Sequence, residues 1–97
     1  MNNRLKSEAV DGLFDAILQL KTREECYLFF EDLCTVQELK AMSQRMEVAQ
    51  MLSAGYPYTE IVSKTGASTA TISRVNRSLA YGVDGYKLVF ERLQEKG

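Results

Sequence analysis

Histidine and clustered cysteine are both missing from this chain of 97 residues. Because histidine nitrogens and cysteine thiolates are the usual zinc ligands, their absence leads us to expect no metal site. Cys26 and Cys34 are the two cysteines, too few for the disulfide framework of a small secreted protein. Both lie in apolar helical patterns, which favours buried free thiols over a redox-active pair.

Long apolar runs are missing as well. No stretch approaches the roughly 18 apolar residues that a membrane-spanning helix requires. The first residues, MNNRLKSEAV, lack the apolar centre of a signal peptide. We therefore expect a cytoplasmic protein.

Signatures of catalysis are equally scarce. The sequence has no activated-cysteine signature and no glycine-rich loop that could cradle a phosphate. No spacing of carboxylates favours an acid–base pair. The sequence therefore predicts that the protein is not an enzyme.

Proline occurs once, at Pro57, and the alternating apolar pattern of strands is rare. Apolar residues instead recur at helical spacing, which predicts an all-α protein of about six helices in one domain, residues 1–97. We expect dimerisation helices over about 8–54, a pair of helices over 58–81 and a last helix over 84–95. The first stripe comprises Val10, Leu13, Phe14, Ile17 and Leu18, and the last comprises Tyr86, Val89, Phe90 and Leu93.

Two capping boxes of the form Thr-x-x-Glu predict helix starts, one at Thr22 with Glu25 and one at Thr35 with Glu38. The helix after Thr35 carries an apolar stripe up to Gly55, with Ser43 as a candidate break into two helices. Asp84 is the expected cap of the last helix.

The segment 26–30, Cys-Tyr-Leu-Phe-Phe, is apolar on every face of its predicted helix. A helix that is apolar all round must be buried on all sides. A chain of this size has only a marginal core of its own. A second subunit is therefore the expected cover, and the sequence predicts an oligomer.

The segment 58–81, YTEIVSKTGASTATISRVNRSLAY, has the layout of a helix-turn-helix. Gly66 supplies the turn between its helices, because only glycine adopts positive φ without a steric penalty. Apolar residues on both sides would pack the two helices together, and Gly82 would end the second. The start of the second helix then presents small side chains, several of them hydrogen-bonding, that fit a DNA major groove.

The charge of the chain is unevenly distributed, although its net value is only −1. Residues 1–34 carry four basic and seven acidic side chains, whereas residues 58–81 carry Lys64, Arg74 and Arg77 against Glu60 alone. The local field matters for binding a polyanion, so an acidic body with a basic reading end is compatible with DNA binding.

The run Thr-Gly-Ala-Ser-Thr-Ala-Thr-Ile-Ser-Arg at 65–74, followed by Ser78 and Leu79, resembles the Trp repressor family. The upstream residues from Leu33 to Gly55 resemble it too, and the likeness is strongest to the Trp-repressor-like YerC/YecD group, whose effector is unassigned. The resemblance implies an intertwined homodimer in which the amino-terminal helices form a shared core. Two heads would then read a palindromic operator in successive major grooves.

The resemblance also implies an effector pocket, for which Thr35, Arg45 and Arg74 occupy the matching positions. In the Trp repressor a glycine follows the recognition-helix arginine and leaves room for the indole ring. Val75 stands there in this chain, so we expect no tryptophan corepressor, although another small effector could bind. Val75 also falls where an ordinary helix-turn-helix has a core residue, and Arg45 could simply pair with Glu38 or another nearby acidic residue.

These residues together predict a sequence-specific transcriptional regulator, a repressor acting on double-stranded DNA as a homodimer. Its expected DNA-binding residues are Thr59, Lys64, Ser68, Thr69, Ala70, Thr71, Ser73 and Arg77. The alternative is a helical dimeric adaptor that binds a protein partner through the same head. The sequence does not indicate the operator or the regulated genes.

Overall fold

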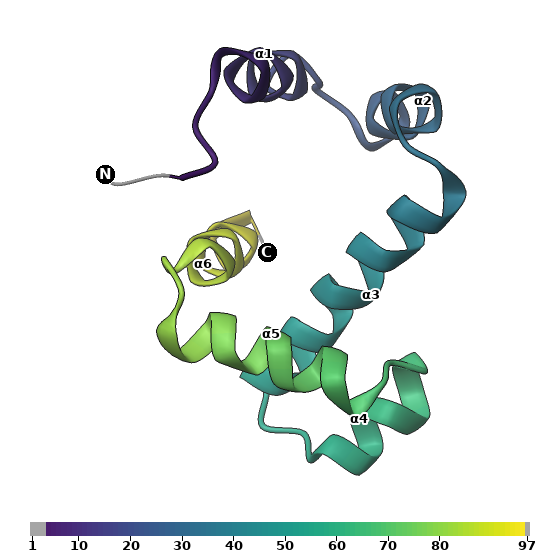
Figure 1. The fold of residues 1–97 in the computed structure, drawn as a ribbon, viewed down its shortest axis with the longest axis vertical. Helices are drawn as coiled ribbons and strands as arrows, with labels where there is room; N and C mark the ends of the chain where they lie inside the picture. The colour runs from purple at the N-terminus through teal and green to yellow at the C-terminus, as the bar shows by residue number, and fades with distance from the viewer. Residues whose placement is uncertain (1–3, 97) are drawn as a thin grey trace. The chain divides into compact units, whose positions relative to one another are not determined.

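The computed structural model describes residues 4–96, and this part of the chain forms six α-helices and no strand (Figure 1). The prediction of an all-α fold with about six helices is confirmed. The helices are α1 (Glu8–Ile17), α2 (Arg23–Leu33), α3 (Val36–Ser53), α4 (Tyr58–Thr65), α5 (Thr69–Tyr81) and α6 (Gly85–Lys96). The chain divides into two compact units, Met1–Leu39 and Lys40–Gly97.

Side-chain caps start the helices of the first unit. The Ser7 hydroxyl accepts a hydrogen bond from the Val10 amide at 3.1 Å and opens α1. Thr22 Oγ1 accepts from the Glu25 amide at 3.1 Å and opens α2, as predicted. The Glu25 carboxylate, however, accepts from the Lys21 amide at 2.8 Å, one residue earlier than an ideal capping box requires.

The first unit has no core of its own within its described residues 4–39, because none of them is buried. The aromatic and aliphatic side chains of α2 illustrate this, since Tyr27 is 66% exposed and Leu28 is 67% exposed. The expectation that both thiols are buried is wrong for the single chain: Cys26 is exposed and Cys34 is half-buried, and both are free.

The long helix α3 is continuous from Val36 to Ser53. The break considered at Ser43 does not occur, because its hydroxyl donates to the Lys40 carbonyl at 3.0 Å within the helix. A serine can bond back to the preceding turn in this way without ending a helix.

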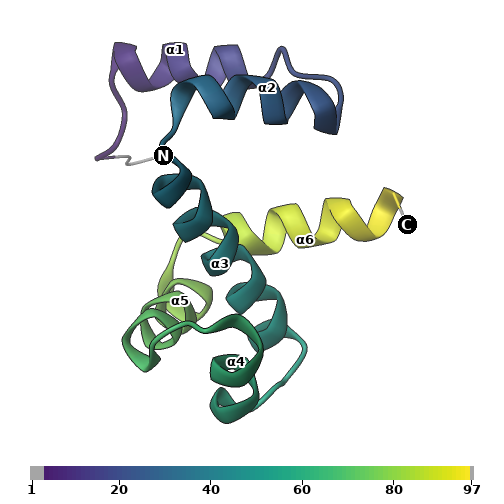
Figure 2. The same cartoon turned by 90° about the vertical axis from the view of Figure 1, so that its right-hand side faces the viewer.

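The second unit is built around a small apolar core to which α3, α4 and α5 all contribute. Figures 1 and 2 show α4 and α5 beside the carboxyl-terminal half of α3. The largest fully buried side chains are Val48, Ile61, Ile72 and Val75. Leu52, Leu79, Tyr86 and Phe90 pack against this core, the last two from α6. The Tyr86 and Phe90 rings stack with their centroids 6.0 Å apart.

A glycine ends α5, as the sequence predicts. The Gly82 amide donates to the Ser78 carbonyl at 2.9 Å. A Cβ at Gly82 would lie against that same carbonyl, closer than van der Waals contact allows. Asp84 follows with φ 64°, and its carbonyl accepts from the Leu88 amide at the start of α6.

Gly82→Ala should therefore destabilise the protein. We expect a loss of about 1–3 kcal/mol in the free energy of unfolding, as for other overpacked sites. Gly85→Ala is the matched control, because a Cβ there meets nothing within 4 Å. Urea unfolding of both variants at one protein concentration tests this expectation, which equal midpoints would contradict.

Candidate nucleic-acid interface

The turn between α4 and α5 has the geometry that the glycine predicted. Gly66 is left-handed, with φ 73° and ψ 5°, and its amide donates to the Val62 carbonyl at 2.9 Å. Ala67 follows and is only 2% exposed. Ser68 then begins the next helix as its N-cap. The left-handed Gly66, followed by the buried Ala67, thus sets α4 and α5 in a helix-turn-helix.

Small side chains surround the start of α5. Ser68, Thr69, Ala70 and Ser73 are exposed, and Thr71 is half-buried. The Ser68 hydroxyl accepts from the Thr71 amide and donates to the Thr71 hydroxyl, both at 3.1 Å. These two hydroxyls are therefore partly engaged with each other, whereas the structure records no side-chain bond for Thr69 or Ser73 among the described residues.

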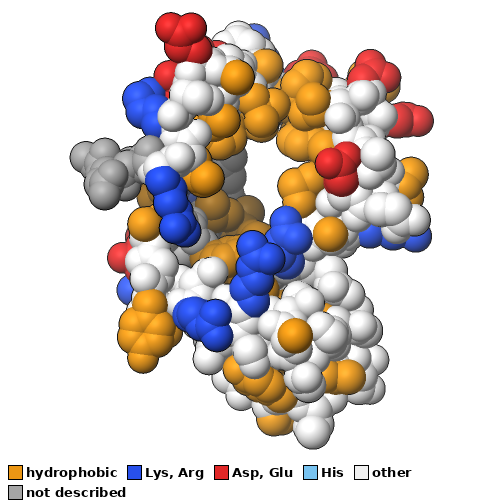
Figure 3. Space-filling view, viewed as in Figure 1, with side chains coloured by type: hydrophobic (Ala, Val, Ile, Leu, Met, Phe, Trp, Pro, Cys, Tyr) orange, Lys and Arg blue, Asp and Glu red, His pale blue; other side chains and the backbone are white. Residues whose placement is uncertain are grey.

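Basic side chains accompany this surface on the same two helices. Lys64, Arg74 and Arg77 are exposed, and so is Thr59 at the start of α4. Figure 3 shows most acidic side chains of the face in view over α1 and α2, while α4 and α5 show none there. The helix-turn-helix, α4 and α5, therefore presents more basic than acidic side chains, as the uneven charge along the sequence predicted.

The three candidate effector residues have different local settings. Thr35 forms a complete capping box: its hydroxyl accepts from the Glu38 amide at 3.1 Å, and its amide donates to the Glu38 carboxylate at 2.8 Å. The backbone bond from Thr35, followed by the side-chain bond, lowers the pKa of Glu38 against the opposing effect of desolvation. The Thr35 side chain thus already serves to start α3.

Arg45 and Arg74 belong to the second unit, Arg45 half-buried on α3 and Arg74 exposed on α5. The ion pair considered between Arg45 and Glu38 does not form among the described residues, where Lys6 and Asp11 make the recorded pair. Both guanidinium groups are therefore without a carboxylate partner in this part of the chain.

Val75 is a core residue. It is 1% exposed and belongs to the same buried cluster as Ile61 and Ile72. Its side chain lies on the inner face of α5, whereas the neighbouring Arg74 is exposed. The interpretation of Val75 as a core residue is confirmed, and its effect on effector binding stays a prediction.

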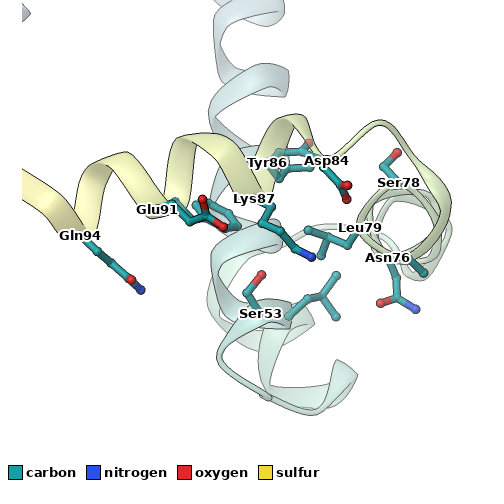
Figure 4. A pocket seen from close by; sticks show the side chains of 12 residues that line it. Ser53, Asn76, Ser78, Leu79, Asp84, Tyr86, Lys87, Glu91 and Gln94 are labelled. Atoms are coloured by element: carbon teal, nitrogen blue, oxygen red, sulfur yellow. The ribbon is translucent and has the colours of Figure 1, made fainter.

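The second unit contains a hollow that the sequence did not predict. It has a volume of about 480 Å³ and lies between the end of α3, the end of α5 and α6 (Figure 4). Its apolar wall is formed by Leu52, Leu79 and Phe90. Its polar groups come from residues that include Asn76, Lys87 and Glu91. The stripe of α6 was visible in the sequence, but only the packing of three separate helices creates the hollow.

The described residues hold neither a metal-binding cluster nor a membrane-spanning helix. No group of three or more histidine, cysteine or carboxylate side chains lies close enough there to hold a metal ion. None of the helices described is both long and apolar enough to cross a membrane.

The fold and the turn define this chain as a helix-turn-helix protein. The family model for Trp repressor protein matches residues 8–94. The chain belongs to the Trp repressor family, as its sequence motifs indicated.

Similar proteins support this assignment. The uncharacterized protein YerC of Bacillus subtilis (strain 168) is 52% identical over 93 residues, covering 96% of this chain and 89% of YerC. A crystal structure of a candidate Trp repressor from Staphylococcus aureus is 55% identical, with a TM-score of 0.90 over 94% of this chain and 91% of that one. A TrpR-like protein from Eubacterium eligens ATCC 27750 is 62% identical, with a TM-score of 0.91 over 96% of each chain.

Proposed function

We propose that this protein is a transcriptional repressor that binds a palindromic DNA operator as a homodimer. The observation that carries the proposal is the left-handed turn at Gly66, which presents the exposed start of α5 beside basic side chains. Membership in the Trp repressor family points to the same class of DNA-binding regulator.

The proposed contacts divide into two kinds. Lys64, Arg77 and Thr59 would hold phosphates, which position the protein on the duplex without reading sequence. Base edges would be contacted from Ser68, Thr69, Ala70, Thr71 and Ser73. Such small side chains make few bidentate base contacts, so specificity would depend on bridging waters and on DNA shape.

The homodimer is supported by the state of the first unit. A folded unit of fewer than about 40 residues normally needs a disulfide, a metal or a partner subunit. Its two cysteines are free, its described residues contain no metal cluster, and none of them is buried. A second copy of the chain would cover the exposed apolar side chains of α1 and α2.

The effector remains a separate proposal. Arg45 and Arg74 are cations without a carboxylate partner in the described chain, so an anionic small molecule is the class that they would bind. Val75 follows Arg74 in the sequence and its β-branched side chain is buried in the core, so this position lacks the room that a glycine would give an indole ring. We therefore propose that the effector class at this position is an anionic small molecule other than tryptophan.

The DNA-binding proposal predicts that in vitro selection recovers duplexes with a two-fold repeat. Binding to them should weaken as salt rises, because phosphate contacts release counterions. Thr69→Glu should abolish binding, since it places a negative charge on the groove-facing surface. Thr69→Ser is the matched control and should bind. No preference over random DNA at moderate salt would contradict the proposal, and an activity that survives Thr69→Glu would favour the protein-binding adaptor.

The homodimer predicts a dimer mass in sedimentation equilibrium at micromolar concentration. Leu28→Glu should shift the protein toward the monomer, because it would bury an unpaired charge in the subunit interface. Thr69→Glu serves as the control, since it adds the same charge outside the proposed interface and should remain dimeric. A wild-type protein that sediments as a monomer would contradict the proposal.

The effector proposal predicts no heat when tryptophan is titrated into the protein in a calorimeter. Val75→Gly enlarges the space beside Arg74 and is the variant in which weak tryptophan binding could appear. It should also lose stability, because a buried aliphatic side chain is removed from the core. Tryptophan binding by the wild type at micromolar concentration would overturn the argument from Val75.

A further inference from the structure

Gln44 makes a side-chain hydrogen bond that joins two segments far apart in the sequence. Its Nε2 donates to the Thr65 carbonyl at 3.2 Å, across 21 positions of the chain. The side-chain hydrogen bonds recorded at the helix caps and turns are local, within five positions. Both Gln44 and Thr65 are half-buried and lie in the second unit. This bond connects the middle of α3 to the turn of the head.

Thr65 is the last residue of α4, and both its carbonyl and its hydroxyl form hydrogen bonds. Its hydroxyl donates to the Ile61 carbonyl at 2.7 Å and accepts from the Ala67 amide at 3.1 Å. Carbonyls in the last turn of a helix lack intrahelical partners, so Gln44 satisfies one that would otherwise be unpaired. The chain from Thr65 through Gly66 to the buried Ala67 is therefore anchored to α3 immediately before α5 begins.

We propose that Gln44 is a positioning residue that fixes the angle of the recognition helix relative to α3. This proposal rests on the proposed DNA-binding dimer. Apolar packing between α3 and the head is non-directional and permits small rotations, whereas a hydrogen bond is directional. In a two-fold dimer, the helix-turn-helix of each subunit follows α3. The angle between α3 and α5 therefore determines the separation of the two recognition helices. Gln44 thereby contributes to the choice of half-site spacing without touching DNA.

The contact itself can be tested in the free protein by amide hydrogen exchange. Gln44→Met keeps the length of the side chain and removes its donor. The Ala67 amide should then exchange about fivefold faster, the factor expected for one net hydrogen bond. The Val48 amide, inside α3, should keep its wild-type protection and shows that the variant is folded. Gln50→Met is the control, because Gln50 is exposed on the same helix.

The consequence for DNA can be tested with selected operators whose half-sites are moved one base pair closer or farther apart. The wild type should discriminate between these spacings, and Gln44→Met should discriminate about fivefold less. Gln44→Glu should lose more of this discrimination between spacings, because its carboxylate would face the Thr65 carbonyl and cannot donate a hydrogen bond. Gln50→Met should discriminate like the wild type.

Two outcomes overturn the positioning role. One is unchanged exchange of the Ala67 amide in Gln44→Met. The other is an equal loss of affinity at every spacing, which a merely structural role would give. If the wild type selects no DNA, the proposed function fails instead, and the exchange measurement still decides whether Gln44 holds the turn.

Discussion

The packing of α4 and α5 against the carboxyl-terminal half of α3 is the constraint on which the rest of this structure depends. Val48, Ile61, Ile72 and Val75 are almost completely buried there. Cutting a buried isoleucine such as Ile61 or Ile72 back to alanine costs about 2–5 kcal/mol. Because the same contacts orient α5, stability and the presentation of its exposed amino-terminal end have one physical origin.

The two units of the chain differ in whether they bury apolar side chains within themselves. The second unit buries a small core within itself, and the turn at Gly66 is held by Thr65 and by the buried Ala67. The first unit has well-capped helices but no buried residue among those described. Capping fixes where a helix begins, whereas only packing against another surface stabilises an apolar face. The subunit interface proposed for this unit would supply that surface.

Local signals in the sequence predicted several elements well. The helix start at Thr22, the capping box at Thr35, the left-handed turn at Gly66 and the end of α5 at Gly82 each depend on residues within one helical turn. The break considered at Ser43 was wrong because a hydroxyl bonded to the preceding turn is compatible with a continuous helix. Burial of Cys26 was wrong for the single chain, because apolar neighbours in sequence do not show which surface will cover them.

The sequence by itself determined the helical class, the helix starts, the glycine turn and the family, because these follow from spacing and from residue types at neighbouring positions. Only the tertiary structure decided that Val75 is buried in the core, that Arg45 forms no ion pair with Glu38, and that Gln44 reaches Thr65. The physical reason is distance along the chain. Contacts between residues far apart in sequence depend on how whole helices pack, and no local pattern records that packing.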